Sequence, residues 1–332
     1  IAGAGLIGQR HAAAIAAAPS SVLTAIADPS PAAQRVAASL DVPWHAKIEA
    51  LLASRAADGV ILATPNALHV EGGLACIEAG LPLLVEKPLA ADLAGGPRLV
   101  EAARAAGVPL AVGHHRRHNP IIAKAKALTE AGELGRITAA HVTAWFRRPD
   151  HYFDAAWRRE PGGGPLAINL IHEVDLLQHL CGPVATVQAM TSNARRGFAV
   201  EDTAAVLLRF EGGALGTITL SDTIAAPWSW ELTARENPAY PATSETSMWV
   251  GGTDGSLAIP NLALWHHPAE PSWWAPIAAK TPIVTHADPL ICQIEQFAAV
   301  IRDGAAPLVS GEDGLAALAV VDAIGEAAAS GL

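Results

Sequence analysis

The chain has 332 residues, enough for two domains, and its 51% hydrophobic and 16% charged residues indicate a fully globular protein. A net charge of −10 argues against nucleic acid or an anionic membrane as a partner. Gly, Pro or charged residues interrupt every apolar segment before the ~18 residues that a membrane span needs. Cys76, Cys181 and Cys292 lack metal-type spacing, which favours small buried side chains in a cytoplasmic protein.

The first part of the chain alternates short apolar runs with Ala-rich segments. No signal peptide is expected, and because Ile1-Ala2 is too short for a buried strand, we expect a few residues of that strand to precede it. Continuous apolar runs are typical of strands buried on both faces of a parallel sheet. We therefore predict a doubly wound Rossmann domain over residues 1–118. The expected strands are Val22–Ala27, Val60–Ala63, Leu83–Val85 and Leu110–Val112, and the expected helices are 7–17, 31–40, 67–79 and 93–106.

Residues 119–332 change pattern, and successive strands with short turns predict an α+β domain with a large, mostly antiparallel open sheet. The last helix could pack back on the first domain. The expected helices are 121–131, 165–180, 288–303 and 312–328, and the expected strands are 137–146, 184–193, 203–210, 214–222, 228–234, 247–251, 255–259 and 262–266.

Gly3–Gly8 is a G-x-G-x-x-G motif between a strand stub and a helix. Gly3 permits the tight turn, Gly5 lets the backbone approach a pyrophosphate, and Gly8 lets the helix pack on the strand. The helix that begins at Leu6 and Ile7 offers N–H groups to phosphates.

Asp28 lies twenty residues after Gly8, at the end of an apolar run. A carboxylate there accepts hydrogen bonds from the adenosine ribose and repels a 2′-phosphate, so NAD is favoured over NADP. The alternative is a helix cap before Pro29 and Pro31. Thr64-Pro65-Asn66 follows the third apolar run, where ligands bind in open α/β sheets; the alternative is a turn before a helix capped by Asn66.

Glu86-Lys87-Pro88 follows the fourth run and completes a recognisable set of motifs, so that the chain resembles the Gfo/Idh/MocA family, which includes glucose–fructose oxidoreductase and inositol dehydrogenase. The resemblance spans both domains, and Glu-Lys-Pro is its most specific part. The matching pieces are Gly3–Gly8, Ala63–Asn66 with His69, Glu86–Pro88, Gly113–Pro120, and Gly162–Gly164 running on to His172 and Asp175.

The resemblance implies that Lys87 binds or deprotonates the substrate hydroxyl, that His69 and Glu86 contribute to the cofactor site, and that the Lys87–Pro88 bond is cis. A lysine at the end of a buried strand, partly desolvated beside a cationic nicotinamide, could exchange a proton near neutrality. The alternative, a solvated surface charge, does not suit a lysine between a buried strand and a proline.

The resemblance makes His172 the second catalytic residue. In the family an Asp stands four residues before this histidine, but here that position is Ile168. Asn169 and Asp175 lie on the same face of an α-helix as His172, so either could orient its imidazole. The alternatives are a helix histidine and a helix-face carboxylate without function.

His115 and Arg116 offer donors to substrate oxygens, and Asn169, Asp175 and Trp157 are further substrate-binding candidates. We expect no metal, because the histidines at 114, 115 and 118 lack a nearby Cys or carboxylate. The tryptophans between residues 145 and 274 favour a homodimer or homotetramer formed through the second sheet.

These features predict hydride transfer between a sugar, polyol or related cyclic hydroxy compound and NAD. One alternative is a reductase of a ketone or imine; the sequence does not set direction. Another is a dinucleotide-binding regulator without chemistry, against which Lys87, His172 and the lack of a DNA-reading segment argue.

Overall fold

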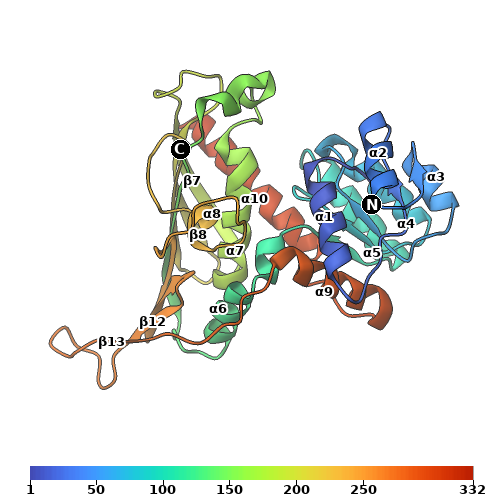
Figure 1. Cartoon of the computed structure of the whole chain (residues 1–332). Helices are drawn as coiled ribbons and strands as arrows, with labels where there is room; N and C mark the ends of the chain where they lie inside the picture. The colour runs from blue at the N-terminus through green and yellow to red at the C-terminus, as the bar shows by residue number, and fades with distance from the viewer. Residues whose placement is uncertain (332) are drawn as a thin grey trace. The chain divides into compact units, whose positions relative to one another are not determined.

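The computed structural model describes residues 1–331 and divides the chain into two compact units (Figure 1). The first unit comprises Ile1–Asn119 and Ala287–Leu318, and the second comprises Pro120–His286 and residues 319–331. In the described part of the chain, no helix is both long and apolar enough to cross a membrane.

The first unit contains a parallel sheet, as predicted. Ala2 forms parallel bridges with Ala27 and with Leu62, and so lies between the two groups of strands. The strands are β1 (Ile26–Ala27), β2 (Trp44–His45), β3 (Val60–Leu62), β4 (Leu83–Val85) and β5 (Leu110–Val112). The helices are α1 (Leu6–Ala17), α2 (Pro31–Ser39), α3 (Ile48–Ala53), η1 (Asn66–Leu68), α4 (His69–Glu78), α5 (Gly95–Ala106), η2 (His115–His118) and α9 (Pro289–Asp303).

Successive residues of these strands belong to two different hydrophobic clusters. Leu83 and Val85 pack in a cluster with residues of α4 and α5, whereas Leu84 packs in a cluster with residues of α1 and α9. Each strand is therefore covered on both faces, which explains why its sequence is a continuous apolar run.

The boundary predicted at residues 118 and 119 needs one correction, because residues 287–318 belong to the first unit rather than to the second domain. Leu290, Ile294 and Phe297 of α9 share a cluster with Ile15 of α1. Beyond α9, Ser310 forms an antiparallel bridge with Ala111 at the edge of β5. The last helix, α10 (Gly311–Ser330), belongs to the first unit as far as Leu318.

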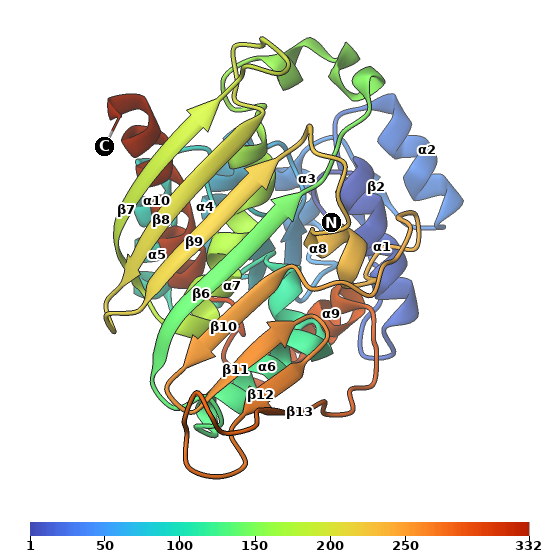
Figure 2. The ribbon, with the colours of Figure 1, turned by 90° about the vertical axis from the view of Figure 1, so that its left-hand side faces the viewer.

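The second unit is built on an eight-stranded sheet in the order β13-β12-β11-β10-β6-β9-β8-β7 (Figure 2). Only the β6–β9 pair is parallel, so the prediction of a mostly antiparallel sheet is confirmed. The strands are β6 (Ile137–Trp145), β7 (Val184–Ser192), β8 (Thr203–Phe210), β9 (Leu215–Ser221), β10 (Met248–Gly252), β11 (Gly255–Ile259), β12 (Ala263–His266) and β13 (Ala278–Lys280).

Helices cover one face of this sheet, since α7 contacts β6 and α6 contacts β11 (Figure 2). Along β8 buried and exposed residues alternate, so one face of the sheet remains open. The helices of this unit are α6 (Pro120–Glu130), η3 (Asp150–Asp154), η4 (Ala156–Arg159), η5 (Leu166–Leu170), α7 (Ile171–Cys181) and α8 (Trp230–Thr233).

The strand predicted at 228–234 is wrong. Ser229 begins a helical turn there, because its carbonyl accepts hydrogen bonds from the Leu232 N–H and from the Thr233 hydroxyl. These local bonds outweigh the strand preference of the surrounding side chains. The short elements β2, α3 and β13 were not predicted.

Candidate active site

The glycine loop joins Ala2 to α1. Gly3 has a φ of 92°, which glycine adopts without strain, and a Cβ there would clash with the backbone of Ala63. A Cβ at Gly8 would clash with the Gly3 carbonyl. A Cβ at Gly5, in contrast, would meet no atom within 4 Å. The protein's own packing therefore explains Gly3 and Gly8, while Gly5 suits a ligand that approaches the backbone closely.

The first turn of α1 starts at Leu6 and Ile7, and the Leu6 side chain is 85% exposed. Gly5 is the N-cap of this twelve-residue helix and provides no side-chain cap, so the first N–H groups of the helix are available to an anion.

Asp28 follows β1, and both of its carboxylate oxygens are anchored by the backbone. Oδ2 accepts a hydrogen bond of 2.9 Å from the Ala4 N–H, and Oδ1 accepts one of 2.8 Å from the Ser30 N–H. Burial would raise the pKa of this carboxyl group, but the hydrogen bonds from Ala4 and Ser30 lower it, and the net shift is downward. Ser30, not Asp28, caps α2. The carboxylate is therefore ionised and held in one orientation next to the glycine loop.

A pocket of about 520 Å³ lies at this edge of the sheet, within the size range of small-molecule sites. Its lining includes Gly3, Asp28, Lys47, Thr64 and Pro65. The Thr64 hydroxyl oxygen is buried and has no hydrogen-bond partner among residues 1–331, as is common where a ligand completes a site. The loop, the carboxylate and this hydroxyl together fit a dinucleotide.

Asn66 and His69 were predicted to join the cofactor site. Asn66 is exposed at the start of η1. His69 is fully buried, with Nδ1 2.8 Å from the Pro88 carbonyl oxygen and Nε2 3.0 Å from the Thr64 carbonyl oxygen. This burial leaves His69 no surface for a cofactor. We assign it instead the task of holding the loops after β3 and β4 together.

Glu86 is also buried rather than open to a cofactor. Its Oε1 lies 2.7 Å from Nε2 of His11, which is 0% exposed, and its Oε2 accepts a hydrogen bond of 3.2 Å from the Lys87 N–H. Burial would raise the pKa of Glu86, but the hydrogen bond and the charge of His11 lower it, and the net shift is downward. Glu86 therefore connects α1 to the backbone of Lys87. His11 was not predicted from the sequence, where its only signal was its place on the face of α1 that also carries Gly8.

Lys87 lies two residues after the end of β4 and is partly exposed, and the Lys87–Pro88 bond is cis, as the resemblance implied. The ends of β1, β3 and β4 are at the same edge of the parallel sheet. Lys87 therefore stands on the same edge as the glycine loop and Asp28.

Residues 115–118 form η2 after β5, with His115 partly exposed and Arg116 4% exposed. Arg116 is a buried guanidinium, so its predicted contact with substrate needs a site that reaches below the surface. Its neighbour Arg117 forms an ion pair of 3.2 Å with Asp313 of the same unit.

In the second unit, α7 carries His172 and Asp175, which are 7% and 1% exposed. Both lie in the first turns of the helix. The preceding residues 166–170 form a π-helical turn rather than the expected α-helix. A π turn holds more residues than an α turn, so α-helical spacing does not place Asn169 relative to His172.

The Asn169 amide is engaged elsewhere than predicted. Its oxygen accepts a short hydrogen bond from Arg148 Nη2, and its nitrogen donates one of 3.4 Å to Glu231. We therefore withdraw Asn169 as the group that orients His172, and Asp175 remains the candidate. Trp157, a further predicted substrate contact, is 55% exposed in η4.

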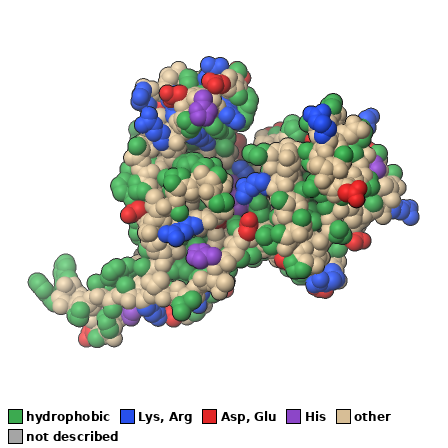
Figure 3. All heavy atoms as spheres, in the orientation of Figure 1, with side chains coloured by type: hydrophobic (Ala, Val, Ile, Leu, Met, Phe, Trp, Pro, Cys, Tyr) green, Lys and Arg blue, Asp and Glu red, His purple; other side chains and the backbone are tan. Residues whose placement is uncertain are grey.

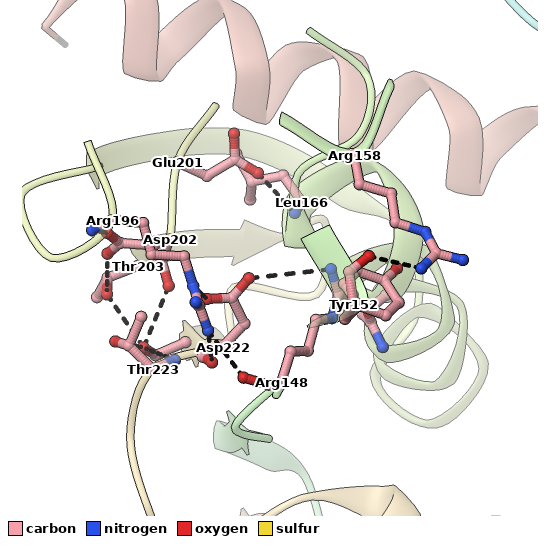
Figure 4. A network of polar contacts seen from close by, with 12 residues as sticks. Arg148, Tyr152, Arg158, Leu166, Arg196, Glu201, Asp202, Thr203, Asp222 and Thr223 are labelled. Carbon is pink, nitrogen blue, oxygen red and sulfur yellow. Dashed lines mark hydrogen bonds and ion pairs between the residues drawn. The ribbon is translucent and has the colours of Figure 1, made fainter. Parts of the chain in front are cut away.

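A charged network that was not predicted from the sequence is centred on Asp222 (Figure 4). Arg196 Nε donates to Asp222 Oδ1 at 2.8 Å, and Arg148 Nη1 lies 3.9 Å from Asp222 Oδ2. Glu201 accepts the Leu166 N–H at 2.8 Å and so holds the start of the π turn. Burial raises the pKa of Asp222 and of Glu201. These residues are far apart in sequence. The adjacent arginines Arg147-Arg148 and Arg195-Arg196 were a weak sequence signal of the network.

Among residues 1–331, no group of three or more His, Cys, Asp or Glu side chains is arranged to hold a metal ion. The donors found in the first unit suit a dinucleotide instead.

A parallel sheet with a glycine loop, an anchored carboxylate and a lysine at one edge defines a dinucleotide-binding oxidoreductase. Residues 1–114 match the oxidoreductase family with an NAD-binding Rossmann fold, and residues 122–258 match the GFO/IDH/MocA C-terminal domain. The chain belongs to the Gfo/Idh/MocA family and is an NAD(P)-dependent oxidoreductase acting on CH–OH groups.

Similar proteins span most of the chain. One is a 1,5-anhydro-D-fructose reductase of Ensifer adhaerens, 29% identical over 86% of this chain and 81% of that protein. Another is an NAD⁺-dependent scyllo-inositol 2-dehydrogenase of Bacillus subtilis (strain 168), 26% identical over 94% of this chain and 88% of that protein. The WlbA dehydrogenase of Bordetella pertussis, solved with NADH and UDP-GlcNAcA, is 29% identical with a TM-score of 0.78, covering 100% of this chain and 96% of that one.

Proposed function

We propose that this protein is an NAD-dependent dehydrogenase that oxidises a secondary alcohol of a sugar, polyol or related cyclic hydroxy compound. The observation that carries the proposal is Lys87, which stands at the sheet edge that also bears the glycine loop and Asp28. The names of the inositol dehydrogenase and anhydrofructose reductase relatives support the substrate class.

Bound NAD⁺ supplies an acceptor for the hydride that leaves the carbinol carbon. The chain's part is to take the hydroxyl proton, and we assign this to the uncharged amine of Lys87. The carbonyl forms as the C–H and O–H bonds break, and the proton remains on the lysine until solvent removes it. In the reductive direction the protonated lysine returns that proton to the alkoxide oxygen.

The buried Glu86–His11 pair supports this role of Lys87. Glu86 accepts the Lys87 N–H and is held in turn by His11, so the backbone at Lys87 is anchored to α1. An anchored backbone limits the positions that the amine can reach, which lowers the entropic cost of aligning it.

We assign His172 a second role, that of hydrogen-bonding a substrate hydroxyl group. It lies in the first turn of α7, and the π turn before it is anchored by Glu201 and Arg148. Asp175, one turn further on, is proposed to orient its imidazole. His115, Arg116 and Trp157 remain proposed substrate contacts.

NAD is the proposed cofactor rather than NADP. The pocket beside Asp28 is lined by the carboxylates of Asp28, Glu49 and Glu71 but by only one ammonium group, that of Lys47. This excess of negative charge would repel the 2′-phosphate of NADP, whereas Asp28 can accept hydrogen bonds from a free ribose hydroxyl.

We further propose that copies of the chain associate through the open face of the eight-stranded sheet and work in the reducing cytoplasm. Trp249 and Trp265 are 39% and 42% exposed on strands β10 and β12 of that sheet. Exposed aromatic side chains grouped on one face are typical of interfaces. The three cysteines are unpaired thiols, which suits a reducing compartment.

The test is a turnover assay over a panel of sugars and polyols with NAD and with NADP, run for the unaltered protein and two variants. Lys87→Ala should lower kcat on the best substrate by about 10²–10⁴-fold, the usual loss for a general acid or base. NAD affinity should hardly change, because the glycine loop and Asp28 carry it.

The control variant is Lys126→Ala, which removes a partly exposed lysine that pairs with Glu130 on α6. It should behave as the unaltered protein. A fully active Lys87→Ala variant would show that another group takes the proton, and absence of turnover on the whole panel would refute the substrate class.

A further inference from the structure

A second hollow lies wholly within the second unit and serves none of the roles described so far. It has a volume of about 300 Å³ and lies between η3 and the turn that joins β7 to β8. Its charged lining consists of Arg147, Arg195 and Arg196 against one carboxylate, Asp150. In a chain with a net charge of −10, such a concentration of guanidinium groups calls for a specific reason.

The turn that carries two of these arginines is built into the fold. The N–H groups of Arg195 and Arg196 both donate to Oδ2 of Asp202, at 3.0 and 2.9 Å, and Asp202 is 2% exposed. The Asn193 amide also donates to the Phe198 carbonyl across the turn at 2.7 Å. These hydrogen bonds to a buried carboxylate fix the backbone at Arg195 and Arg196 before any ligand arrives.

The Arg196 side chain is 11% exposed and is oriented by four contacts (Figure 4). Its Nε donates to Asp222 Oδ1, and its Nη2 donates to the carbonyl oxygens of Arg148 and Asp222 at 3.0 and 2.9 Å. Its guanidinium also stacks 4.1 Å above the ring of Phe153. Nη1 makes none of these bonds, and Arg196 is one of the residues that line the hollow.

Asp150 does not neutralise the hollow. Its side chain is 100% exposed and its carboxylate lies 3.5 Å from Arg196 Nη1, so water screens the interaction strongly. Asp202 and Asp222 are 2% exposed and do not line the hollow. Figure 3 shows Lys and Arg side chains, with Asp or Glu and His side chains among them, at the end of the second unit that carries η3 and η4.

The walls add flat apolar surface to this charge. Phe153 and Phe198 line the hollow with ring centroids 5.2 Å apart. An anionic group beside a ring or carbon skeleton would therefore find both charge-assisted hydrogen bonds and an apolar surface.

The hollow is connected to the proposed substrate helix. Arg148, whose carbonyl accepts from Arg196, donates through its own side chain to Asn169 in the π turn before His172. On the basis of the function proposed above, we propose that this hollow binds the carboxylate or phosphate group of an anionic sugar or polyol substrate.

The test compares the binding of D-glucose, D-glucuronate, D-glucose 6-phosphate and inorganic phosphate by calorimetric titration of the protein loaded with NADH. The variant Arg147→Gln/Arg195→Gln removes two exposed charges but leaves Arg196. Replacing Arg196 would remove the nearest positive charge from the buried Asp222 carboxylate. Arg209→Gln, which removes an exposed arginine of β8, is the matched control.

We expect at least one anionic sugar to bind about tenfold or more tightly than D-glucose. The double variant should weaken that binding about 10- to 100-fold while Arg209→Gln does not, and glucose binding should stay as it was. Equal binding of anionic sugars by the double variant and the unaltered protein would overturn the proposal.

Inorganic phosphate separates the two sources of an anion. Competition between phosphate and the anionic sugar supports the proposal, whereas phosphate binding that depends on the arginines but does not compete would show that the hollow serves another anion and overturn the substrate assignment. Failure of the proposed function would look different, because arginine-dependent binding would persist without turnover of any sugar.

Discussion

At the scale of single residues, the backbone groups that already bind the Asp28 carboxylate fix it in an orientation that suits a cofactor. Asp28 uses one acceptor position on each oxygen for the backbone N–H groups of Ala4 and Ser30. Each oxygen keeps a further lone pair, so a ribose diol could be bound without reorientation of the carboxylate. Its lowered pKa means that it stays charged across the neutral range.

Replacing Asp28 should change cofactor choice. We expect Asp28→Ser to weaken NAD binding and to relieve the repulsion of a 2′-phosphate, so that the preference for NAD over NADP falls about 10- to 100-fold. Fluorescence titration with NADH and NADPH measures both affinities. Asp58→Ser, an exposed carboxylate that precedes β3, is the control and should leave the ratio unchanged. Tighter NADPH binding by the unaltered protein would contradict the proposed preference.

His172 and Lys87 should differ in which kinetic constant they control. If His172 hydrogen-bonds a substrate hydroxyl, His172→Ala should mainly raise KM, whereas Lys87→Ala should mainly lower kcat. Steady-state kinetics with NAD at saturation distinguish the two. Loss of turnover by His172→Ala at saturating substrate would instead make the histidine the base.

At the scale of elements, the Glu86–His11 pair joins α1 to the end of β4. Glu86 is 6% exposed and His11 0%, so removing one partner leaves a buried, uncompensated group. The lowered pKa of Glu86 means that the pair's contribution to stability is present above the ordinary carboxyl value of 4.5. It is lost as the pH falls below 4.5 through the lowered value.

We therefore expect His11→Leu to destabilise the protein by about 3–5 kcal/mol at neutral pH. Without its partner, burial alone would raise the pKa of Glu86. The stability lost by His11→Leu should therefore become smaller as the pH falls toward 4.5 and the carboxyl becomes neutral. Chemical unfolding from pH 4.5 to 7 measures it. The double variant His11→Leu/Glu86→Gln should recover part of the lost stability. A loss of stability that does not depend on pH would show that only packing, and not the charge of Glu86, is affected.

The elements that could be predicted from sequence are those whose pattern is set by burial. Runs such as Leu83–Val85 are apolar on every residue because both faces are covered, and β8 alternates because one face is open. The turn at Trp230–Thr233 could not be predicted, since its hydrogen bonds to Ser229 depend on local geometry. The π turn at 166–170 was missed for the same reason, as no residue type specifies it.

Residues of the candidate site could be predicted only where a short stretch of sequence is enough to show their role. Gly3–Gly8, Asp28 and Lys87 each end a strand or begin a helix, so their local pattern was sufficient. His69 and Glu86 were taken as ligand contacts because the sequence does not reveal burial, and both point into the protein. The Arg148–Asp222–Arg196 network joins three distant segments, which a single sequence does not bring together.

At the scale of the whole molecule, exposed apolar side chains gather near one edge of the second unit's sheet. Trp273 and Trp274, in the loop between β12 and β13, are 95% and 89% exposed, and Ile283 is 97% exposed (Figure 1). The exposure of apolar side chains to water is unfavourable, so an oligomer that buried this region would be stabilised.

We expect Trp273→Ser/Trp274→Ser to shift a dimer or tetramer toward the monomer, because it removes two large apolar groups from this exposed region of the second unit. Light scattering across a dilution series measures the mass. Leu40→Ser, at an exposed apolar position of the first unit, should leave the mass as in the unaltered protein. A monomeric unaltered protein at all concentrations would contradict the proposed assembly.

The return of residues 287–318 to the first unit has a consequence for the order in which the protein can fold during synthesis. The Rossmann core lacks Leu290, Ile294 and Phe297 until α9 leaves the ribosome, although its strands are made first. At about 5–20 residues per second, translation of the second unit's main segment delays α9 on the order of ten seconds. Throughout that interval, Ile15 and Leu84 lack the apolar cover that α9 later provides, so the nascent chain exposes a surface that chaperones recognise.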